Sequence, residues 1–377
     1  MNGFQFTAPA IRTTPHRILL VCTQRIGDVL LATPLARTLK RAWPGAAIDM
    51  LVFRGTEGAL EGNPDIAQVL AFPRRAGLGE TFAQIRRLWR GYDLALTPLP
   101  TDRARLYCWI AGRRRIGLLR TGARERLKGL LLNQWELFDD LDTHTVAMGL
   151  RLAEMLGVAP SFEVVPPQVR PTRLGSLLAP LAGSPFAVLH VYPKFNYKMW
   201  PQDAWIALAN RLHTNNLGVA FTGGNEPAER AYVDGIVRRL PAGALTLNLA
   251  GSLSLGETAE LIRRARLYVG PDTAVTHIAA ATGTPTIALF GPSNPVKWGP
   301  WPSDWRSGLS PWARRGSRRQ GNVHLLQGPG DCVPCLLEGC ERNVNSGSEC
   351  LRMLHAETVF QAAAAALSEH HCAGRNG

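Results

Sequence analysis

The stretch Gly270-Pro271-Asp272-Thr273-Ala274-Val275-Thr276-His277 is typical of a strand end, a sharp turn and a helix start. An apolar strand over 267–269 precedes it, and a second one over 286–290 follows the helix. Asp272 and Thr273 are favoured helix N-caps, and the unpaired N–H groups of a helix start favour an anion such as phosphate. His277 lies on the same helical face as Thr273. Taken alone, the pattern also fits an ordinary capped helix with a core histidine.

Short apolar strands alternate with helices twice along the chain, on either side of a proline-rich stretch over 159–185. The first series has expected strands at 18–21, 48–53, 66–72, 94–96 and 115–118, and helices at 28–43, 81–90, 106–111 and 145–156. The second has expected strands at 187–191, 219–222, 245–249, 267–269 and 286–290, and further helices at 204–213, 229–240 and 255–264. An irregular segment over 291–350 and a helix over 356–368 complete the chain.

This alternation is typical of parallel sheets that are covered on both faces by helices. We therefore predict an α/β fold with two Rossmann-like, doubly wound domains facing across a cleft. The expected boundaries are 1–170 for the N-terminal domain, 171–355 for the C-terminal domain, and 356–377 for a final helix and tail.

The loop after the first strand reads Thr23-Gln24-Arg25-Ile26-Gly27-Asp28. In a parallel sheet such a loop lies at the carboxyl edge, where ligands bind. Asp28 could simply cap the following helix. Its carboxylate could instead act as a general base that accepts a proton from a substrate hydroxyl. One side chain can serve both purposes only if capping does not occupy it.

Two further loops occupy equivalent positions in the second half of the chain. The first, after the strand that ends near Val191, contains Lys194 and Lys198, and either lysine could meet a phosphate as a point charge. The second contains Gly223-Gly224, which permit close backbone approach. Glu226 could accept hydrogen bonds from a ribose diol, and Glu229 is the alternative.

The formal net charge of +13 and the pI near 10.0 indicate an anionic partner. The densest basic run is interleaved with Ile116, Leu118 and Leu119, and suits a segment lying against something acidic and partly apolar. The members of this run are Arg113, Arg114, Arg115, Arg120, Arg124, Arg126 and Lys128. A solvated face is the ordinary interpretation of such a run. No window approaches the roughly 18 apolar residues of a spanning helix, and we see no signal peptide, so we expect a cytoplasmic protein.

Cys332, Cys335, Cys340 and Cys350 follow the spacing Cys-x2-Cys-x4-Cys-x9-Cys. Four thiolates could hold a tetrahedral structural zinc ion. Free thiols packing an irregular loop fit the same pattern, and a disulfide framework is disfavoured in a large chain without an export signal.

Together these motifs resemble the heptosyltransferases of lipopolysaccharide core synthesis, glycosyltransferase family 9. The resemblance covers nearly the whole chain in matching order. It is carried by Arg25-Ile26-Gly27-Asp28-Val29-Leu30 with Thr33-Pro34, Lys198-x-Trp200-Pro201, Thr222-Gly223-Gly224, Asp272-Thr273-Ala274 with His277, and Ala288-Leu289-Phe290-Gly291-Pro292.

The resemblance implies a GT-B fold and an inverting, metal-independent transfer of heptose from an ADP-activated donor, with no cofactor required. The acceptor would be an anionic lipid A–inner-core glycolipid at the inner face of the inner membrane. By position, Asp28 would be the general base, and the donor would contact Lys198, Glu226, Asp272, Thr273, Ala274 and His277. The acceptor's anionic groups would meet Arg25, Arg113, Arg115 and Arg120.

Three alternatives stay open at this point. A nucleotide-sugar epimerase would share the architecture and would act without an acceptor. A basic nucleic-acid-binding protein would explain the pI, although we see no binding signature and expect no nucleic-acid partner. A degenerate transferase would bind the nucleotide sugar without turnover.

Overall fold

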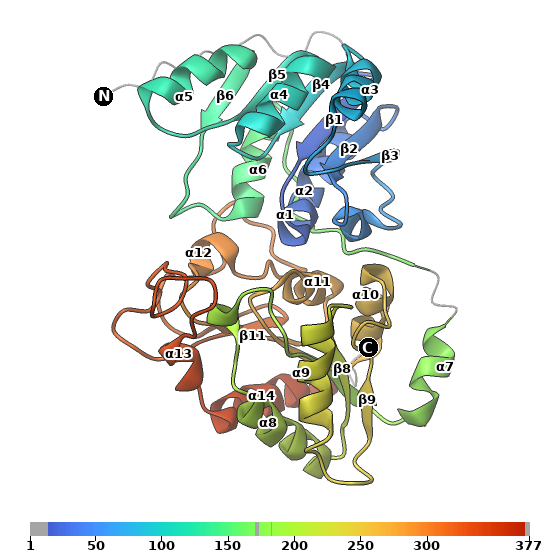
Figure 1. The fold of residues 1–377 in the computed structure, drawn as a ribbon, viewed down its shortest axis with the longest axis vertical. Helices are drawn as coiled ribbons and strands as arrows, with labels where there is room; N and C mark the ends of the chain where they lie inside the picture. Colours follow the sequence, from blue (N-terminus) through green and yellow to red (C-terminus); the bar gives the residue numbers. More distant parts are fainter. Residues whose placement is uncertain (1–13, 170–172, 182, 374–377) are drawn as a thin grey trace. The chain divides into compact units, whose positions relative to one another are not determined.

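The computed structural model describes residues 14–169, 173–181 and 183–373. The chain divides into two compact units (Figure 1). The first unit extends to Val165 and also includes Arg306–Leu309. The second unit takes 166–305 and continues from Ser310.

The first unit contains a six-stranded sheet in the order β3-β2-β1-β4-β5-β6, with all neighbouring strands parallel. The strands are β1 (Arg17–Cys22), β2 (Ala47–Phe53), β3 (Gln68–Phe72), β4 (Tyr92–Thr97), β5 (Gly112–Leu119) and β6 (Gln134–Leu137). The helices are α1 (Ile26–Leu31), α2 (Thr33–Ala42), α3 (Leu78–Leu88), α4 (Asp102–Ala111), α5 (Ala123–Lys128) and α6 (Thr145–Glu154), with 3-10 turns at Glu57–Leu60 and Gly129–Leu131. The strand order reverses between β1 and β4, where a doubly wound sheet binds ligands.

The helices of this unit form two layers. Helix α4 contacts α3, the 3-10 turn at Gly129–Leu131 and strands β1, β4 and β5, whereas α1, α2 and α6 contact one another. Because parallel crossovers are right-handed, helices that connect strands on either side of the reversal cover opposite faces of the sheet.

The first helix differs from our prediction of one helix over 28–43 that Asp28 caps. Helix α1 begins at Ile26 and ends at Leu31, and α2 begins anew at Thr33. Pro34 explains the break, because proline has no N–H and is tolerated in the first turn of a helix but not in its interior. At the join, the Thr33 hydroxyl donates to the carbonyl of Leu30 at 2.7 Å.

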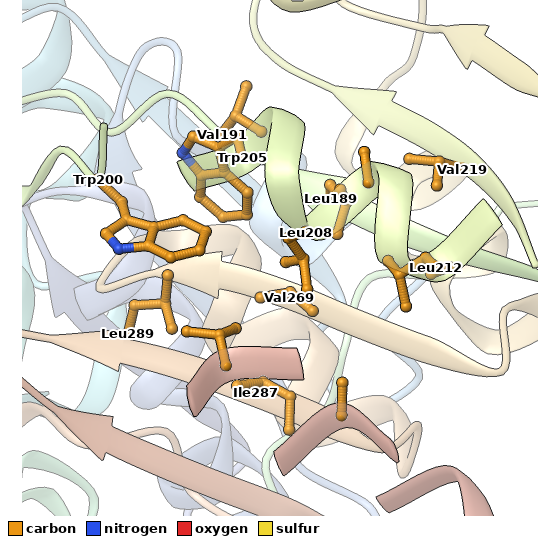
Figure 2. Close-up of a cluster of buried hydrophobic side chains, with 14 of the residues drawn as sticks. Leu189, Val191, Trp200, Trp205, Leu208, Leu212, Val219, Val269, Ile287 and Leu289 are labelled. Atoms are coloured by element: carbon orange, nitrogen blue, oxygen red, sulfur yellow. The ribbon is translucent and has the colours of Figure 1, made fainter. Parts of the chain in front are cut away.

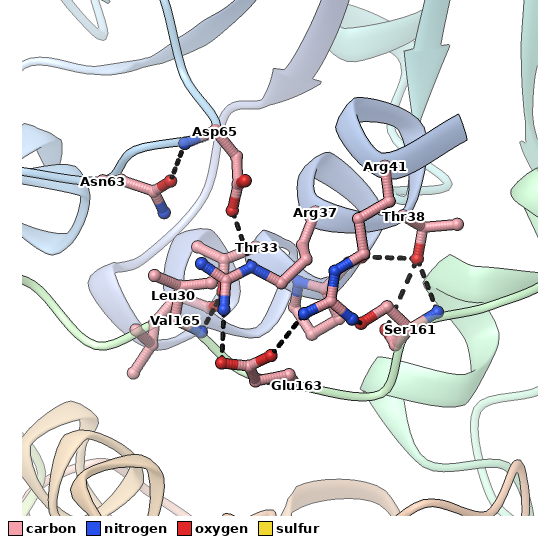
Figure 3. Close-up of polar contacts among 11 residues, drawn as sticks. Leu30, Thr33, Arg37, Thr38, Arg41, Asn63, Asp65, Ser161, Glu163 and Val165 are labelled. Carbon is pink, nitrogen blue, oxygen red and sulfur yellow. Dashed lines mark hydrogen bonds and ion pairs between the residues drawn. The ribbon is translucent and has the colours of Figure 1, made fainter. Parts of the chain in front are cut away.

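Polar contacts hold the last segment of this unit along α2 (Figure 3). Arg37 pairs with Asp65 at 2.8 Å and also with Glu163, which Arg41 contacts at 3.0 Å. The Val165 N–H donates to the Thr33 hydroxyl at 2.9 Å. These contacts fix the chain up to the point where the first unit ends.

The second unit contains a seven-stranded sheet in the order β12-β13-β11-β10-β7-β8-β9. Only the pair β12–β13 is antiparallel among its hydrogen-bonded neighbours. The strands are β7 (Phe186–His190), β8 (Gly218–Thr222), β9 (Thr246–Asn248), β10 (Leu267–Pro271), β11 (Thr286–Phe290), β12 (Arg318–Gln320) and β13 (Val323–Gln327). The helices are α7 (Leu174–Leu178), α8 (Gln202–Thr214), α9 (Pro227–Val237), α10 (Leu255–Arg264), α11 (Ala274–Thr282), α12 (Pro295–Trp298), α13 (Glu349–Arg352) and α14 (Ala356–Ala373), with 3-10 turns at Ala179–Leu181 and Asn196–Lys198.

Two tryptophans anchor the core of this unit between the sheet and α8 (Figure 2). Trp200 and Trp205 are fully buried, and their rings meet edge to face with centroids 4.8 Å apart, a favoured aromatic geometry. The Trp200 indole N–H donates to the Leu354 carbonyl at 2.8 Å. The motif Trp200-Pro201 is therefore a packing element that fixes the chain just after Lys198.

The α/β class predicted from the sequence is confirmed, with two doubly wound units whose sheets are mainly parallel. The segment 291–350 that we expected to be irregular contains α12, β12, β13 and the start of α13. Strand β13 extends the parallel sheet beside β11. Among the described residues, no helix is long and apolar enough to span a bilayer.

Candidate active site

Lys198 and Asp272 meet at the switch point of the second sheet. Strands β7 and β10 are parallel neighbours there, and the chain order reverses between them. Lys198 lies in the 3-10 turn after β7, and Asp272 directly follows β10. The ammonium of Lys198 lies 2.5 Å from a carboxylate oxygen of Asp272, whose side chain is 7% exposed. Burial acts to raise the pKa of Asp272, but the charge of Lys198, with smaller effects of His277 and Ser293, lowers it overall.

The competing lysine occupies a different environment. Lys194 is exposed, and its ammonium lies 6.0 Å from the centroid of the Phe195 ring. The structure therefore brings Lys198, and not Lys194, into contact with Asp272 at the switch point.

His277 lies in α11 and is buried. Burial lowers its pKa to about 4; the charge of Asp272 opposes this shift and that of Lys198 adds to it. The imidazole is therefore neutral at pH 7. Within the described part of the chain, its buried Nδ1 has no hydrogen-bond partner. A buried polar atom without a partner is costly, so His277 is poised to bond a group that α11 receives.

The start of α11 leaves its backbone donors available. Thr273 is the N-cap residue, but its side chain makes no capping hydrogen bond, and Ala274 is the first helical residue. The Thr276 hydroxyl bonds instead to the Pro271 carbonyl at 2.5 Å and to the Tyr268 hydroxyl at 2.9 Å. These bonds fix the turn from inside and leave the N–H groups of the helix start for an anion.

Beside this cluster, β7 and β8 end in a hydrogen-bonded pair. His190 Nδ1 lies 3.2 Å from the Thr222 hydroxyl, and burial lowers the pKa of His190 to about 4. Thr222 precedes Gly223-Gly224, and the loop has no room for a side chain at Gly224. A Cβ on Gly224 would lie 2.6 Å from a carboxylate oxygen of Glu229.

The two candidate glutamates differ in environment. Glu226 is the exposed N-cap residue of α9 and makes no capping bond with its side chain. Glu229 lies beneath the glycine turn, where burial raises its pKa and the Gly224 N–H opposes that shift. Glu226 therefore offers a solvent-exposed carboxylate in the loop after β8, and Glu229 packs against the glycines of the same loop.

In the first unit, Asp28 sits in the first turn of α1 as its third residue, not at the N-cap position that we expected. Its carboxylate accepts a hydrogen bond from the backbone N–H of Arg25, the N-cap residue, at 3.1 Å. The side chain is half-buried. Capping therefore holds the Asp28 carboxylate at the carboxyl end of β1.

The predicted acceptor arginines are not brought together. Arg113 is the second residue of β5 and Arg115 the fourth, whereas Arg120 follows the end of the strand, about 23 Å beyond Arg113 and about 17 Å beyond Arg115 along an extended chain. Arg25 lies at the carboxyl edge, with Arg120. Arg115 donates to the Asn133 side chain at 2.9 Å. Ile116, Leu118 and Leu119, which we took as part of a surface segment, are buried in the sheet.

Two arginines that sequence reasoning missed lie at that carboxyl edge. The guanidinium carbons of Arg74 and Arg103 lie 4.6 and 5.3 Å from the centroid of the Phe53 ring. Arg103 also donates to the Arg74 carbonyl at 2.7 Å. Arg74 lies two residues after the end of β3, and a position in the loop after a parallel strand is the signal that pointed to Asp28 and could have found it. Arg103 lies in the first turn of α4, where no such signal marks it.

The structure does not assemble the possible zinc site. Within the described residues, no group of three or more His, Cys, Asp or Glu side chains has an arrangement suited to a metal ion. Cys350 is buried in α13, whereas Cys332 and Cys340 are exposed and Cys335 is intermediate, all as free thiols. Burial, followed by smaller effects of the three other cysteines, raises the pKa of Cys350 to about 11. These thiols are neighbours without forming the tetrahedral set that zinc requires.

Comparison with known proteins identifies the family. Residues 82–313 match the sequence profile of glycosyltransferase family 9 (heptosyltransferase). Lipopolysaccharide heptosyltransferase 3 of Escherichia coli K12 is 30% identical over 291 residues, which cover 73% of this chain and 82% of that protein. The chain belongs to glycosyltransferase family 9.

Solved structures of the family have the same fold, which confirms the GT-B architecture predicted from the sequence. The family 9 glycosyltransferase of Veillonella parvula superposes with a TM-score of 0.74 at 20% identity, covering 94% of this chain and 97% of the other. The E. coli heptosyltransferase WaaC with ADP superposes with a TM-score of 0.69 at 21% identity, covering 93% and 99%. Family membership decides against the nucleotide-sugar epimerase and the nucleic-acid-binding protein: this chain is a glycosyltransferase.

Proposed function

We propose that this glycosyltransferase moves a heptose from an ADP-activated donor to an anionic lipid A–inner-core acceptor. The observation that carries the proposal is the Lys198–Asp272 ion pair beside a buried His277 nitrogen that has no hydrogen-bond partner among the described residues, in the first turn of α11. Related proteins support the choice of donor and acceptor, since they are lipopolysaccharide heptosyltransferases and one was solved with ADP.

The donor half of the proposal assigns each group by its chemistry. Lys198 and the amides at Thr273 and Ala274 would neutralise the diphosphate, because a helix start and a cation stabilise a leaving group's developing charge. His277 Nδ1 would bond a diphosphate oxygen or sugar hydroxyl. Asp272, being itself anionic, would act through Lys198 by holding its ammonium in place. Glu226 would accept from the ribose hydroxyls.

The acceptor half assigns Asp28 as the general base. Asp28 would take the proton of the attacking hydroxyl, whose oxygen would bond to the anomeric carbon while that carbon's bond to the diphosphate oxygen breaks. ADP would leave with the bonding electrons, and the anomeric centre would invert. The step needs no metal if Lys198 and α11 supply the positive charge.

The acceptor's anionic groups would meet the arginines of the carboxyl edge. Arg25 and Arg120 retain this assignment, and Arg74 and Arg103 join it. Arg113 and Arg115 lie further back along β5 and would contact a more distant part of the acceptor. An acceptor of this kind would place the enzyme in the cytoplasm, at the inner face of the inner membrane.

Replacing Asp28 by asparagine tests the proposal, because the amide keeps a capping oxygen but cannot accept the proton. We expect transfer to fall about 100-fold to 10,000-fold, while calorimetry gives nearly unchanged binding of the ADP-sugar. Mass spectrometry of a truncated glycolipid incubated with ADP-heptose measures the product.

Asp203→Asn is the matched control, since Asp203 is an exposed acid in the first turn of α8. It should transfer at the wild-type rate. Turnover by Asp28→Asn within about tenfold of wild type would remove Asp28 from the role of base. Product formed by the wild type from UDP-sugars but not from ADP-sugars would overturn the donor assignment.

A further inference from the structure

Positive charge is concentrated in one short part of the chain. Residues 74–130 contain fourteen Lys and Arg against four Asp and Glu, a surplus of ten in a chain whose net charge is +13. The acids are already engaged within the protein: Asp93 accepts two backbone N–H groups, and the other three lie in ion pairs. The surplus is therefore carried by exposed cations, which include Arg75, Arg86, Arg87, Arg124 and Arg126.

The same segment exposes large apolar side chains. They come from α3, α4, α5 and the 3-10 turn after α5, the elements that make one helical layer of the first unit (Figure 1). Leu78 is 93% exposed, Phe82 68%, Leu106 46%, Leu127 69% and Leu130 78%. We call these five side chains and the five exposed arginines the α3–α4–α5 surface.

The other helical layer lacks this property. No large apolar side chain of α1, α2 or α6, all of which the structure describes, is among the exposed ones. Scattered exposed leucines are ordinary on a protein surface, but a concentration on one layer marks an interaction site. The asymmetry therefore favours a partner on the α3–α4–α5 surface over one on the layer of α1, α2 and α6.

Helix α5 is held in a way that leaves its apolar side chains outside. It has no buried residue of its own. Glu125 pairs with the buried Arg105 of α4 at 3.1 Å and with Lys128 at 2.8 Å, and Lys128 pairs with Asp102 at 2.9 Å. Ion pairs thus fasten α5 to α4 while Leu127 stays exposed.

We propose that the α3–α4–α5 surface docks this enzyme onto a lipid bilayer that contains anionic lipids. Arginines would contact the headgroup phosphates, and the leucines and Phe82 would enter the boundary between headgroups and acyl chains. The inference deepens the proposed function and rests on it in one respect, since a glycolipid acceptor is what such docking would reach.

Charge selects the bilayer over other occupants. Two copies of this surface would repel each other, because each carries the same positive surplus. A nucleic acid would satisfy the arginines but would leave the leucines in water. An anionic bilayer satisfies both kinds of side chain.

The experiment is co-flotation of the full chain with vesicles of phosphatidylcholine, alone or mixed with phosphatidylglycerol. We expect binding only to the anionic vesicles, and weaker binding as salt rises. Replacing Arg124 and Arg126 by glutamine should weaken binding roughly 30-fold, since each cation near the surface contributes about 1 kcal/mol. Replacing Leu127 and Leu130 by serine should weaken it by at least about tenfold, since even partial insertion of one leucine contributes about 1 kcal/mol.

Two variants serve as matched controls. Leu309→Ser removes a leucine that is 76% exposed, as exposed as Leu130. Arg238→Gln removes an exposed arginine at the end of α9. Both should bind anionic vesicles as the wild type does. All of these positions are exposed, so the variants should fold, which circular dichroism and thermal unfolding check.

Transfer to a water-soluble, delipidated acceptor separates this inference from the proposed function. Full transfer by the surface variants with lost flotation supports the inference. Transfer by the wild type without flotation overturns the inference and leaves the proposed function standing. Flotation without transfer to any lipopolysaccharide fragment overturns the proposed function alone. If light scattering instead shows that Leu127→Ser/Leu130→Ser dissolves a dimer while flotation is unchanged, the surface is a self-contact and the inference is wrong.

Discussion

At the scale of single residues, burial distinguishes groups that the sequence leaves equal. Lys194 and Lys198 follow the same strand with equal chemistry, and spacing offers no basis for choosing between them. The folded chain pairs only Lys198 with the buried Asp272. The choice depends on which loop residue faces the neighbouring strand β10, and that contact spans 74 positions of sequence.

Replacing Lys198 by alanine tests this choice. A hydrogen bond to a charged group contributes about 1.5–3 kcal/mol, so ADP should bind roughly 10-fold to 150-fold more weakly. Lys194→Ala, at an exposed lysine of the same loop, should change the affinity less than about twofold. Calorimetry with ADP measures both. The reverse order of effects would assign the phosphate to Lys194.

The same substitution leaves Asp272 buried without its cation, which is strongly destabilising. The double variant Lys198→Ala/Asp272→Asn removes this complication because the asparagine carries no charge. It should recover stability in urea unfolding but not ADP affinity. Recovery of affinity along with stability would show that Lys198 acts only as a structural partner of Asp272.

At the scale of elements, prediction succeeded where local signals and packing agree. Helix α10 has the predicted bounds 255–264, since Ser254 and Glu257 form a reciprocal capping box. Strand β11 also has its predicted bounds, because an apolar run of five residues is buried throughout. The predicted helix 28–43 was wrong because Pro34 divides it, and β13 was missed because polar residues adjoin and interrupt a short apolar run.

The turn before α11 depends on one glycine. A Cβ on Gly270 would lie 2.2 Å from the Tyr268 hydroxyl. This hydroxyl makes a buried hydrogen bond with the hydroxyl of Thr276. Gly270→Ala must displace the tyrosine ring, and such overpacking costs about 1–3 kcal/mol. We expect reduced stability in urea unfolding and weaker ADP binding, because the start of α11 shifts.

Gly235→Ala is the comparison for that experiment. Gly235 lies inside α9, and a Cβ there would meet only the Gln202 side chain at 3.4 Å. Alanine is the better helix former, so stability should stay equal or rise by about 0.5–1 kcal/mol. Equal stability of the two variants would mean that the turn yields to the extra methyl group.

At the scale of the whole molecule, the first five strands of each sheet follow the same order, and each sheet reverses at the pair of strands that carries its candidate groups. Alternation of strands and helices was sufficient to predict this architecture and the loops after β1, β7, β8 and β10. It was not sufficient to predict which arginines lie close together. A basic run looks like one patch in sequence, but a strand places Arg113 and Arg120 at opposite ends. Arg74, in the loop after β3, and Arg103, in the first turn of α4, instead converge on the Phe53 ring.

Two buried histidines make the stability of the folded protein depend on pH. Burial lowers the pKa of His190 and His277 to about 4, from an ordinary value near 6.5. Between these values the unfolded chain binds protons that the native state does not, so stability falls as pH falls. The loss is of order 1–3 kcal/mol for each histidine by pH 4. Above about pH 6.5 the two histidines cause no such loss of stability.

Urea unfolding of His190→Gln between pH 7 and pH 4.5 measures how much His190 contributes to this loss of stability, because glutamine cannot take up the proton. The variant should lose less stability on acidification than the wild type, whatever its stability at pH 7. Asp272 does not confuse the result, since its lowered pKa removes stability only below about 3.8. His355→Gln, at an exposed histidine, should retain the wild-type slope. A His190→Gln slope equal to that of wild type would show that the native protein already accepts the His190 proton in this range, and that the β7–β8 end is open to water.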